Sequence, residues 1–365
     1  MVIKWLYGFV SASNLLRCLV LLSLLLFSSS CLFESIERKG DRGDCSDVTN
    51  GISEQDLYSL GSEEVNIDNL KASLKSWNSA TRYQALWVLI FKTEPHTILT
   101  TLMTAVQDED PRVRETSIKG LATAAESQAT LIPQIFPILT QAMRDRDPGV
   151  RVAGFSGLTT VALHQKTLIP RVLPLFTNGL KDRSACVRAS SASFLESLIR
   201  ESGPYKSELE LVIPDLIVMA SRDSSAWARR HALDGLGSAN VASEEIVPIL
   251  ITVLKSDPDA TLRNVSATAL GQKVAEPEAT KALIEAISDQ DARVRTSAVY
   301  SLLKIEPNPL INQSNLEKLS DQGLKTAIWA LERWSKGPDV ENWKKTAIPP
   351  ILNALIAERS SRLQK

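Results

Sequence analysis

One sequence pattern occurs six times along the chain, at intervals of 32 to 41 residues, and it limits the possible fold more than any other feature. The segments LIPQIFPILTQAMRDRDPGVR (131–151) and LIPRVLPLFTNGLKDRSACVR (168–188) show it most clearly, because their prolines, Asp-Arg pairs and final Val-Arg coincide. Every copy has an arginine and, six residues earlier, an aspartate. The six pairs are Asp108 and Arg114, Asp145 and Arg151, Asp182 and Arg188, Asp223 and Arg229, Asp257 and Arg263, and Asp289 and Arg295. Internal repetition at this period predicts an array of similar structural units.

Each copy also carries the signals of a helix that begins just before its arginine. Asp or Ser stands four residues before the arginine, where its side chain can accept the free N–H groups of a first helical turn. The residue three after the arginine is small and the residue seven after it is always leucine, and these offsets share one helical face. An apolar helical stretch precedes each aspartate. The predicted unit is therefore a helix, an acidic turn and a second helix.

The acidic turn, as in DEDPRVRETSIKGL (108–121), could be a metal site, an active site, a phosphate-binding site or a structural element. Six copies at one spacing and without histidine favour the structural role. When the copies stack, each arginine should lie near an aspartate of its own or the adjacent repeat and form a ladder of charged hydrogen bonds. We therefore predict the twelve ladder residues to be structural, with no metal site and no catalytic residue among them.

The outermost copies lack part of the pattern. Arg82 follows the helix cap Asn78, but Ser76 replaces the aspartate, and at the far end Leu324 replaces the arginine. Terminal repeats have a neighbour on one side only. We expect about eight repeats over residues 66–336, and we expect truncation of Arg82 to cost less stability than truncation of Arg188.

The Asp-x-Asp-Pro-x-Val-Arg turn of Asp108–Arg114, its variants and the small and leucine positions resemble the HEAT-repeat family. The resemblance covers about three quarters of the chain and is specific for fold, not for function. It implies an all-α protein, a right-handed α-solenoid of about eight HEAT-like helix-turn-helix repeats. The short copies look similar to the HEAT-like units of phycobilin lyases.

The first thirty residues have the organisation of an export signal. Lys4 and Arg17 precede the apolar run CLVLLSLLLF (18–27), which is shorter than the roughly 20 residues of a spanning helix. Small residues then lead to Cys31, which resembles the lipobox of bacterial lipoproteins, although Ser28 stands where that family prefers leucine. We expect residues 1–30 to be a signal peptide and Cys31 to be lipidated, with simple cleavage near this cysteine as the alternative.

The remaining segments are expected to flank the array. Residues 31–65 are predicted to be a polar tether, and residues 337–365 a C-terminal capping helix. Three tryptophans near this helix could pack beneath a cap or form a partner-binding patch; they are Trp329, Trp334 and Trp343. Cys45 and Cys186 could form a disulfide in an oxidising compartment, or Cys186 could be simple packing.

The composition and motifs argue against several functions. The 41 lysines and arginines balance 42 acids, unlike the basic excess of a dedicated nucleic-acid binder. His96, His164 and His231 fall in different repeats, and none is followed by glutamate, unlike the iron-holding His-Glu pairs of deoxyhypusine hydroxylase. Phosphate-binding and hydrolase motifs do not occur. We expect no metal, no cofactor and no small-molecule substrate.

The sequence therefore predicts a non-enzymatic scaffold. We expect it to be exported to the cell envelope, held at the membrane by a lipid anchor and engaged with protein partners along its surface. One alternative is a phycobilin-lyase-like protein that attaches or detaches a chromophore in the cytosol, which requires that Met1–Ser30 is not a signal. Another is a membrane-tethered subunit whose catalytic partner is a different chain.

Overall fold

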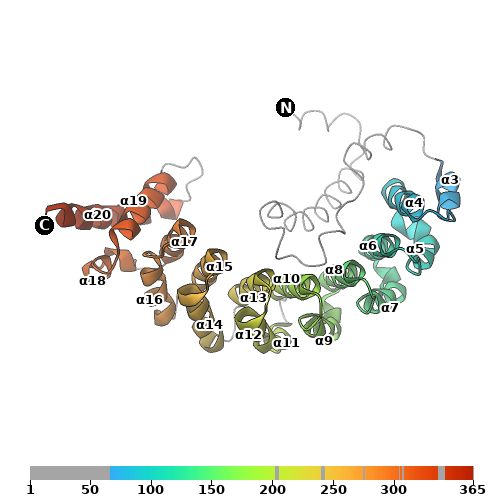
Figure 1. Ribbon diagram of the computed structural model, residues 1–365, viewed down its shortest axis with the longest axis horizontal. Coiled ribbons are helices and arrows are strands. Elements are labelled where there is room, and N and C mark those ends of the chain that lie inside the picture. The colour runs from blue at the N-terminus through green and yellow to red at the C-terminus, as the bar shows by residue number, and fades with distance from the viewer. Residues whose placement is uncertain are drawn as a thin grey trace. The chain divides into compact units, whose positions relative to one another are not determined.

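The computed structural model describes residues 66–201, 205–239, 243–273, 276–303, 305, 308–335 and 342–364. Figure 1 shows these residues as a succession of helices, and none of them lies in a β-strand. No helix among them combines the length and hydrophobicity that crossing a bilayer would need. The predicted signal (1–30), Cys31 and the predicted tether (31–65) lie outside the described residues.

The helices form two rows (Figure 1), and each acidic turn connects a helix of the first row to a helix of the second. The first row precedes the turns and comprises α3 (Ile67–Ser73), α5 (Leu99–Ala105), α7 (Ile132–Ala142), α9 (Ile169–Gly179), α12 (Ile213–Arg222), α14 (Ser243–Ser256), α16 (Pro277–Ala286) and α18 (Gln313–Leu316). The second row follows the turns and comprises α4 (Ser79–Lys92), α6 (Pro111–Ser127), α8 (Pro148–His164), α10 (Ala185–Glu201), α13 (Ala226–Ser238), α15 (Ala260–Leu270), α17 (Ala292–Leu302) and α19 (Asp321–Ser335). Short helices lead into several first-row helices: η3 (Pro95–Ile98), η4 (Ala129–Leu131), η5 (Lys166–Leu168), α11 (Lys206–Glu210) and η7 (Pro309–Ile311).

These rows make eight helix pairs in the part of the chain that the structure describes. From α4 to α17, each second-row helix packs on its own first-row partner and on the second-row helix of the next pair, as α8 does with α7 and α10. The predicted all-α solenoid of helix-turn-helix repeats is therefore confirmed.

Helix capping explains where the second row begins. Asp147 Oδ1 accepts the backbone N–H groups of Gly149 and Val150 at 2.8 and 3.2 Å, and Pro148 occupies the first helical position. Asp110, Ser225, Asp259 and Asp291 also cap their helices with the side chain. Because these five turns are capped in the same way, the ladder residues that flank them occupy equivalent positions from pair to pair.

The repeated leucine fills the core between the rows. All six of these leucines are fully buried, namely Leu121, Leu158, Leu195, Leu236, Leu270 and Leu302. The small position allows close approach within a pair: a Cβ at Gly154 would lie 2.9 Å from the backbone nitrogen of Met143. The sequence offsets therefore correspond to one apolar seam that runs through the array.

The last helix, α20 (Asn342–Gln364), packs across the final pair and η7. Its Ile351 and Leu355 are buried, and Arg362 donates to the carbonyls of Leu319 and Leu316 at 2.8 and 2.9 Å. Trp334 packs edge-on against Tyr300 at 5.4 Å between ring centroids. Trp329 is 53% exposed, and the side chain of Trp343 is not among those that the structure describes.

Truncation of a seam leucine should destabilise the array strongly. Leu158→Ala should cost about 2–5 kcal/mol, because it removes buried methyl groups and leaves a cavity. Leu211→Ala is the control, because Leu211 is 77% exposed and its truncation should cost less than ~0.5 kcal/mol. Urea unfolding followed by circular dichroism measures both, and similar costs for the two variants would contradict the assignment of the seam.

Candidate functional site: the ladder and the turn edge

Each ladder arginine joins two consecutive repeats, and Arg151 is typical. Its Nε and Nη2 donate to the two carboxylate oxygens of Asp182 at 2.9 and 2.7 Å. Its Nη1 donates to the backbone carbonyls of Asp145 and Arg146, in its own turn, at 3.0 and 3.2 Å. Asp182 also accepts the backbone N–H of Ser184 at 2.8 Å. The Arg151 side chain thus forms hydrogen bonds both within its own turn and to the turn of the next repeat.

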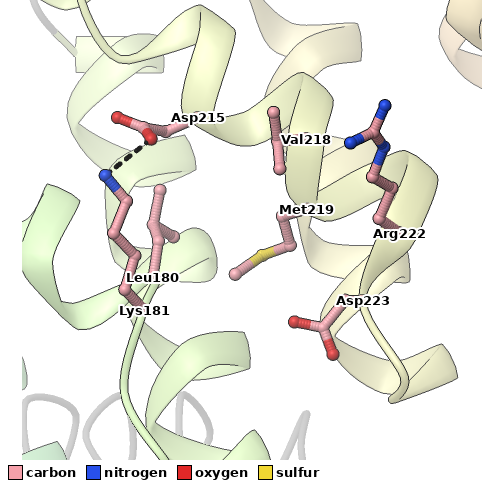
Figure 2. Close-up of a pocket in the computed structure, with 7 residues that line it drawn as sticks. All are labelled: Leu180, Lys181, Asp215, Val218, Met219, Arg222 and Asp223. Atoms are coloured by element: carbon pink, nitrogen blue, oxygen red, sulfur yellow. Dashed lines mark ion pairs between the residues drawn. The ribbon is translucent and has the colours of Figure 1, made fainter.

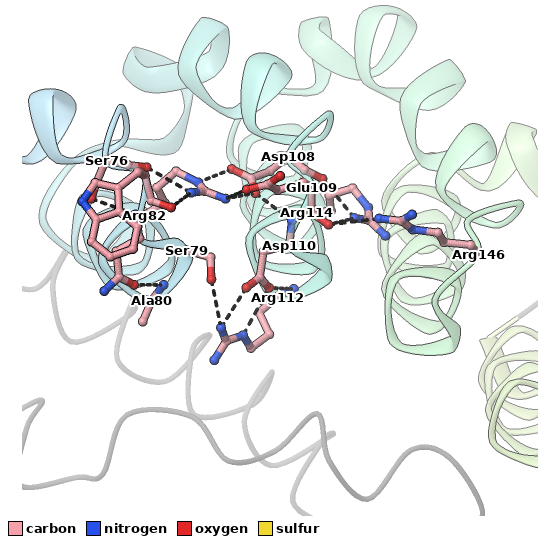
Figure 3. A network of polar contacts seen from close by, with 12 residues as sticks. Ser76, Ser79, Ala80, Arg82, Asp108, Glu109, Asp110, Arg112, Arg114 and Arg146 are labelled. Atoms are coloured by element: carbon pink, nitrogen blue, oxygen red, sulfur yellow. Dashed lines mark hydrogen bonds and ion pairs between the residues drawn. The ribbon is translucent and has the colours of Figure 1, made fainter.

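The same bidentate pair recurs along the array. It joins Arg82 to Asp108, Arg114 to Asp145, Arg188 to Asp223 and Arg263 to Asp289, with nitrogen–oxygen distances between 2.6 and 2.9 Å. Figure 3 shows the start of this network around Arg82, Asp108 and Arg114. The sequence pattern left open whether the aspartate comes from the same or the adjacent repeat. The structure places it in the following repeat at each of these rungs.

Two arginines make weaker contacts across repeats. Arg229 Nε lies 3.6 Å from Asp257 Oδ2, which is an ion pair but too long for a hydrogen bond, while Arg229 Nη1 still donates to the carbonyl of Asp223 at 3.0 Å. Arg295 meets the hydroxyl of Thr326 at 2.8 Å in place of a carboxylate. The bidentate rungs are therefore unbroken from Arg82 to Asp223, and the pair of Arg263 and Asp289 adds one more beyond the weak rung of Arg229.

The structure does not support the reason for expecting Arg82 to contribute less stability than Arg188. Arg82 makes the full bidentate pair with Asp108, and its Nη1 donates to the carbonyls of Ser76 and Trp77. The turn contact needs only the backbone oxygen of residue 76, so the missing aspartate side chain does not weaken it. The aspartate of the pair belongs to the next repeat, so the arginine that lacks it is the last one, Arg295.

Burial and hydrogen bonding act in opposite directions on the ladder carboxylates. Burial alone would raise the pKa of Asp108, Asp145 and Asp223 by disfavouring their charged form. Hydrogen bonds from the arginine of the preceding repeat and from the local backbone N–H outweigh this effect. Each pKa therefore lies below its ordinary value, and these carboxylates are charged at neutral pH.

A second row of contacts runs along the solvent side of the same turns. Arg146 Nη2 donates to the backbone carbonyl of Glu109 at 3.1 Å, and Arg183 Nη2 donates to that of Arg146 at 3.1 Å. Sequence reasoning missed these contacts, although a basic residue at one offset in two adjacent copies was a usable signal. They tie the exposed edge of three successive turns together.

A shallow pocket of about 220 Å³ opens on this edge, between the end of α9 and α12. Lys181 donates to Asp215 across it at 2.9 Å, and Val218 is 55% exposed. Figure 2 shows Val218 and Met219 between the side chains of Lys181 and Arg222. The pocket thus combines an apolar floor with charged walls.

One cluster has residue types that can bind a metal. Ligand atoms of Glu196 on α10 and of His231 and Asp234 on α13 lie within 4.8 Å of one another. Arg200 pairs with Glu196, however, and Arg230 Nε lies 3.9 Å from Asp234 Oδ2. Because these cations already compensate both carboxylates, the cluster is an inter-helix polar contact and does not carry a metal assignment. The sequence could not reveal it, because its members come from different repeats.

The cysteines divide between the described residues and the rest of the chain. Cys186 is buried in α10 at 4% exposure and is disulfide-bonded, with its partner outside the described residues. Cys31, the predicted lipidation site, also lies outside the described residues.

Comparison with known families identifies the repeat. The family model of HEAT repeats matches residues 67–151, from α3 into α8, and residues 213–303, from α12 to just beyond α17. These two stretches match HEAT repeats. The resemblance to this family is thereby confirmed, whereas the resemblances to a lipoprotein signal and to phycobilin lyases stay predictions. A search of the curated proteins finds no match to this sequence.

Several solved HEAT-like structures resemble the array at low identity. Kap95p bound to RanGDP has 13% identity and a TM-score of 0.47, over 82% of this chain and 52% of Kap95p. Kap121p has 16% identity and a TM-score of 0.49, over 87% of this chain and 35% of Kap121p. YibA of Escherichia coli has 19% identity and a TM-score of 0.40, over 82% of this chain and 97% of YibA. The chain thus spans about half of the first protein and about a third of the second, and similarity at this level carries no functional argument.

Loss of a ladder arginine should be costly at the first HEAT repeats as well as in the middle. Arg151→Ala should destabilise the array by about 3 kcal/mol, because it leaves the largely buried Asp182 carboxylate without its counter-charge. Arg82→Ala should cost about as much, and Arg229→Ala less. Arg293→Ala is the control, since its side chain is 61% exposed and its truncation should cost less than ~1 kcal/mol. Chemical unfolding of the four variants ranks them, and a harmless Arg82→Ala would contradict the geometry.

Acid should unfold the HEAT array through its ladder. Because the folded-state pKa values of Asp108, Asp145 and Asp223 are depressed, their contribution to stability is complete above the unfolded-state pKa, about 4. The contribution is lost as pH falls below that value through the folded-state pKa. Melting temperatures measured from pH 7 to pH 3 should therefore fall mainly below about pH 4. Asp145→Asn should melt lower at pH 7 and lose less on acidification than the native chain.

Proposed function

We propose that the chain is a non-enzymatic HEAT-repeat scaffold that is exported, anchored to the cell envelope through lipidated Cys31, and bound to protein partners. The observation that supports this proposal is that the repeated side chains are buried, whereas other side chains of the same repeats are exposed. The ladder residues and the seam leucines are largely buried and hold the repeats together. Other side chains at the turns and on the outer helix faces are exposed to solvent. Arrays of this kind use such extended surfaces for binding.

Exposed large apolar side chains support partner binding. Trp77 is 90% exposed at the first turn, Val218 is 55% exposed at the pocket, and Trp329 is 53% exposed with the Arg333 guanidinium 5.5 Å from its ring centroid. Aromatic residues and arginine are enriched where proteins bind one another. These positions are spread from one end of the array to the other, as expected of a scaffold with an elongated contact surface.

Two features support export. Residues 1–30 have the charged, apolar and small-residue order of a secretory signal, followed by Cys31. The disulfide at Cys186 suits an oxidising compartment, since disulfides are rare where thiols are kept reduced. We propose Cys45 as its partner, because Cys31 would carry the lipid and Cys18 would leave with the signal.

Metabolic fatty-acid labelling combined with cell fractionation tests the anchor. The native chain should incorporate label and sediment with membranes, because lipidation at Cys31 would follow signal cleavage. Cys31→Ser should lose the label, and Cys186→Ser is the matched control that should keep it. An unlabelled soluble chain that retains residues 1–30 would overturn export and bring the cytosolic alternatives forward. In that case a bilin that co-purifies from a pigment-producing host would identify the lyase-like role.

A further inference from the structure

Three consecutive turns in the middle of the array carry exposed basic side chains beside their ladder aspartates. We call these residues the basic edge: Arg144, Arg146, Lys181, Arg183 and Arg222. They stand one residue before or one residue after a ladder aspartate. At the two corresponding positions, the turn of Asp108 has Gln107 and Glu109, and the turns of Asp257 and Asp289 have serine, proline or glutamine. The turn at Ser76, which lacks a ladder aspartate, has Lys75 and Trp77. Among the six turns that carry a ladder aspartate, basic residues at these positions are thus confined to the three in the middle.

The charge of this edge is not cancelled by the neighbouring ladder. Asp145, Asp182 and Asp223 each pair with the arginine of the preceding repeat. Lys181 pairs with Asp215 on the rim of the pocket, at 64% exposure of its side chain. The remaining guanidinium groups of the edge face solvent. A positive strip therefore crosses three repeats of a chain whose net charge is only −1.

Helix electrostatics do not account for this distribution. A cation at the C-terminal end of a first-row helix interacts favourably with the helix dipole, and Arg144, Lys181 and Arg222 occupy that position. The same benefit would exist in every repeat, yet Gln107, Ser256 and Ser288 stand there in other repeats. Among the six turns with a ladder aspartate, the restriction to three adjacent ones indicates a ligand that spans those turns.

The spacing of the edge suits one extended polypeptide. Packed helices lie about 8–10 Å apart, and the bonds from Arg146 to Glu109 and from Arg183 to Arg146 show that successive turns are within reach of one side chain. A chain in the extended polyproline II conformation advances about 3.1 Å per residue and presents every third side chain on one face, about 9 Å apart. Acidic side chains at every third residue of such a chain would therefore meet successive turns.

The pocket adds an apolar requirement to the charged one. Val218 and Met219 lie between Lys181 and Arg222, which are two members of the edge (Figure 2). An apolar side chain placed here would cover Val218, and acidic residues on either side of it would face the two cations. A broad anionic surface offers no such side chain, and a long nucleic acid would gain little from a chain without net positive charge.

We propose that the basic edge binds an extended acidic segment of a partner protein, with one apolar side chain seated against Val218 and Met219. The proposal rests on the scaffold function and names the chemistry of its partner. Binding of this kind depends on exposed charges, so it weakens as salt rises and screens them.

A designed peptide tests the proposal directly. The probe is a fluorescein-labelled 13-residue peptide with glutamate at every third position, one central leucine and Ser-Gly spacers, and a second peptide carries glutamine in place of glutamate. Anisotropy should show binding of the acidic peptide to the folded array at low salt, and loss of binding at high salt or with glutamine. Arg144→Glu, Lys181→Glu and Arg222→Glu together should weaken binding by about tenfold or more. Arg146 and Arg183 stay unchanged, because they bond to backbone carbonyls of adjacent turns.

The matched control reverses three exposed lysines away from the edge, namely Lys281, Lys318 and Lys325. It changes the net charge equally and should leave binding within about twofold, with circular dichroism showing both triple variants folded. Equal losses in the two triple variants would reduce the effect to net charge and overturn the proposal. Preference of the edge for phosphatidylglycerol vesicles over the peptide would also overturn it, in favour of a membrane contact.

A second variant separates the apolar contact from the charges. Val218→Ser should weaken binding of the leucine peptide several-fold and leave binding of an alanine version unchanged. Photo-crosslinking of the native chain in cells separates this inference from the scaffold function. A partner captured equally by the native chain and the edge triple variant would refute the basic edge alone, whereas the absence of any partner would refute the scaffold function.

Discussion

The bidentate pair between an arginine and the aspartate of the next repeat is the contact on which the rest of the array depends. The leucine seam supplies the larger free energy, but apolar contacts have little directionality and tolerate sliding. A guanidinium fork donates to both oxygens of a carboxylate in one planar arrangement, and leaving a buried charge unpaired is costly. Arg151, which holds two carbonyls of its own turn and both oxygens of Asp182, therefore sets the register of one repeat on the next.

The contacts of the ladder differ in strength from one repeat to the next, although the sequence pattern is regular. Arg229 keeps its turn contact but reaches Asp257 only as an ion pair at 3.6 Å, and Arg295 meets a hydroxyl. Stability in a repeat array is close to a sum of repeat and interface terms, so weak rungs mark interfaces that open at lower cost. At the far end α20 takes over, with Arg362 donating to carbonyls of the last pair as a ladder arginine does to its own turn.

Structural and exposed charges are interleaved on the same turns. In Arg144-Asp145-Arg146, the central aspartate belongs to the ladder and the two arginines face solvent. Because the ladder holds successive turns in register, side chains beside it are also held in a line. The exposed residues of such a surface can be substituted in one repeat at a time without disturbing the fold. This is one physical reason why solenoids can bind many different partners.

The sequence by itself determined the local unit and its repetition. Asp147, Pro148, Gly154 and Leu158 specify a capped helix with one small and one apolar contact, and those preferences act within a few residues of each other. The candidate ladder residues could be named for the same reason, since six copies share them. The predictions for the signal-like segment and Cys31 rest on the sequence alone, because both lie outside the described residues.

Only the tertiary structure decided which aspartate each arginine meets. That choice depends on how repeats stack, so Arg82 proved fully paired although its own repeat lacks the aspartate. Three other features also join residues of different repeats. They are the cluster of Glu196, His231 and Asp234, the contact from Arg183 to the turn of Arg146, and the pocket at Val218. Hydrophobic periodicity constrains a residue's face within its own helix, whereas contacts across repeats depend on distances that exist only once the helices have packed.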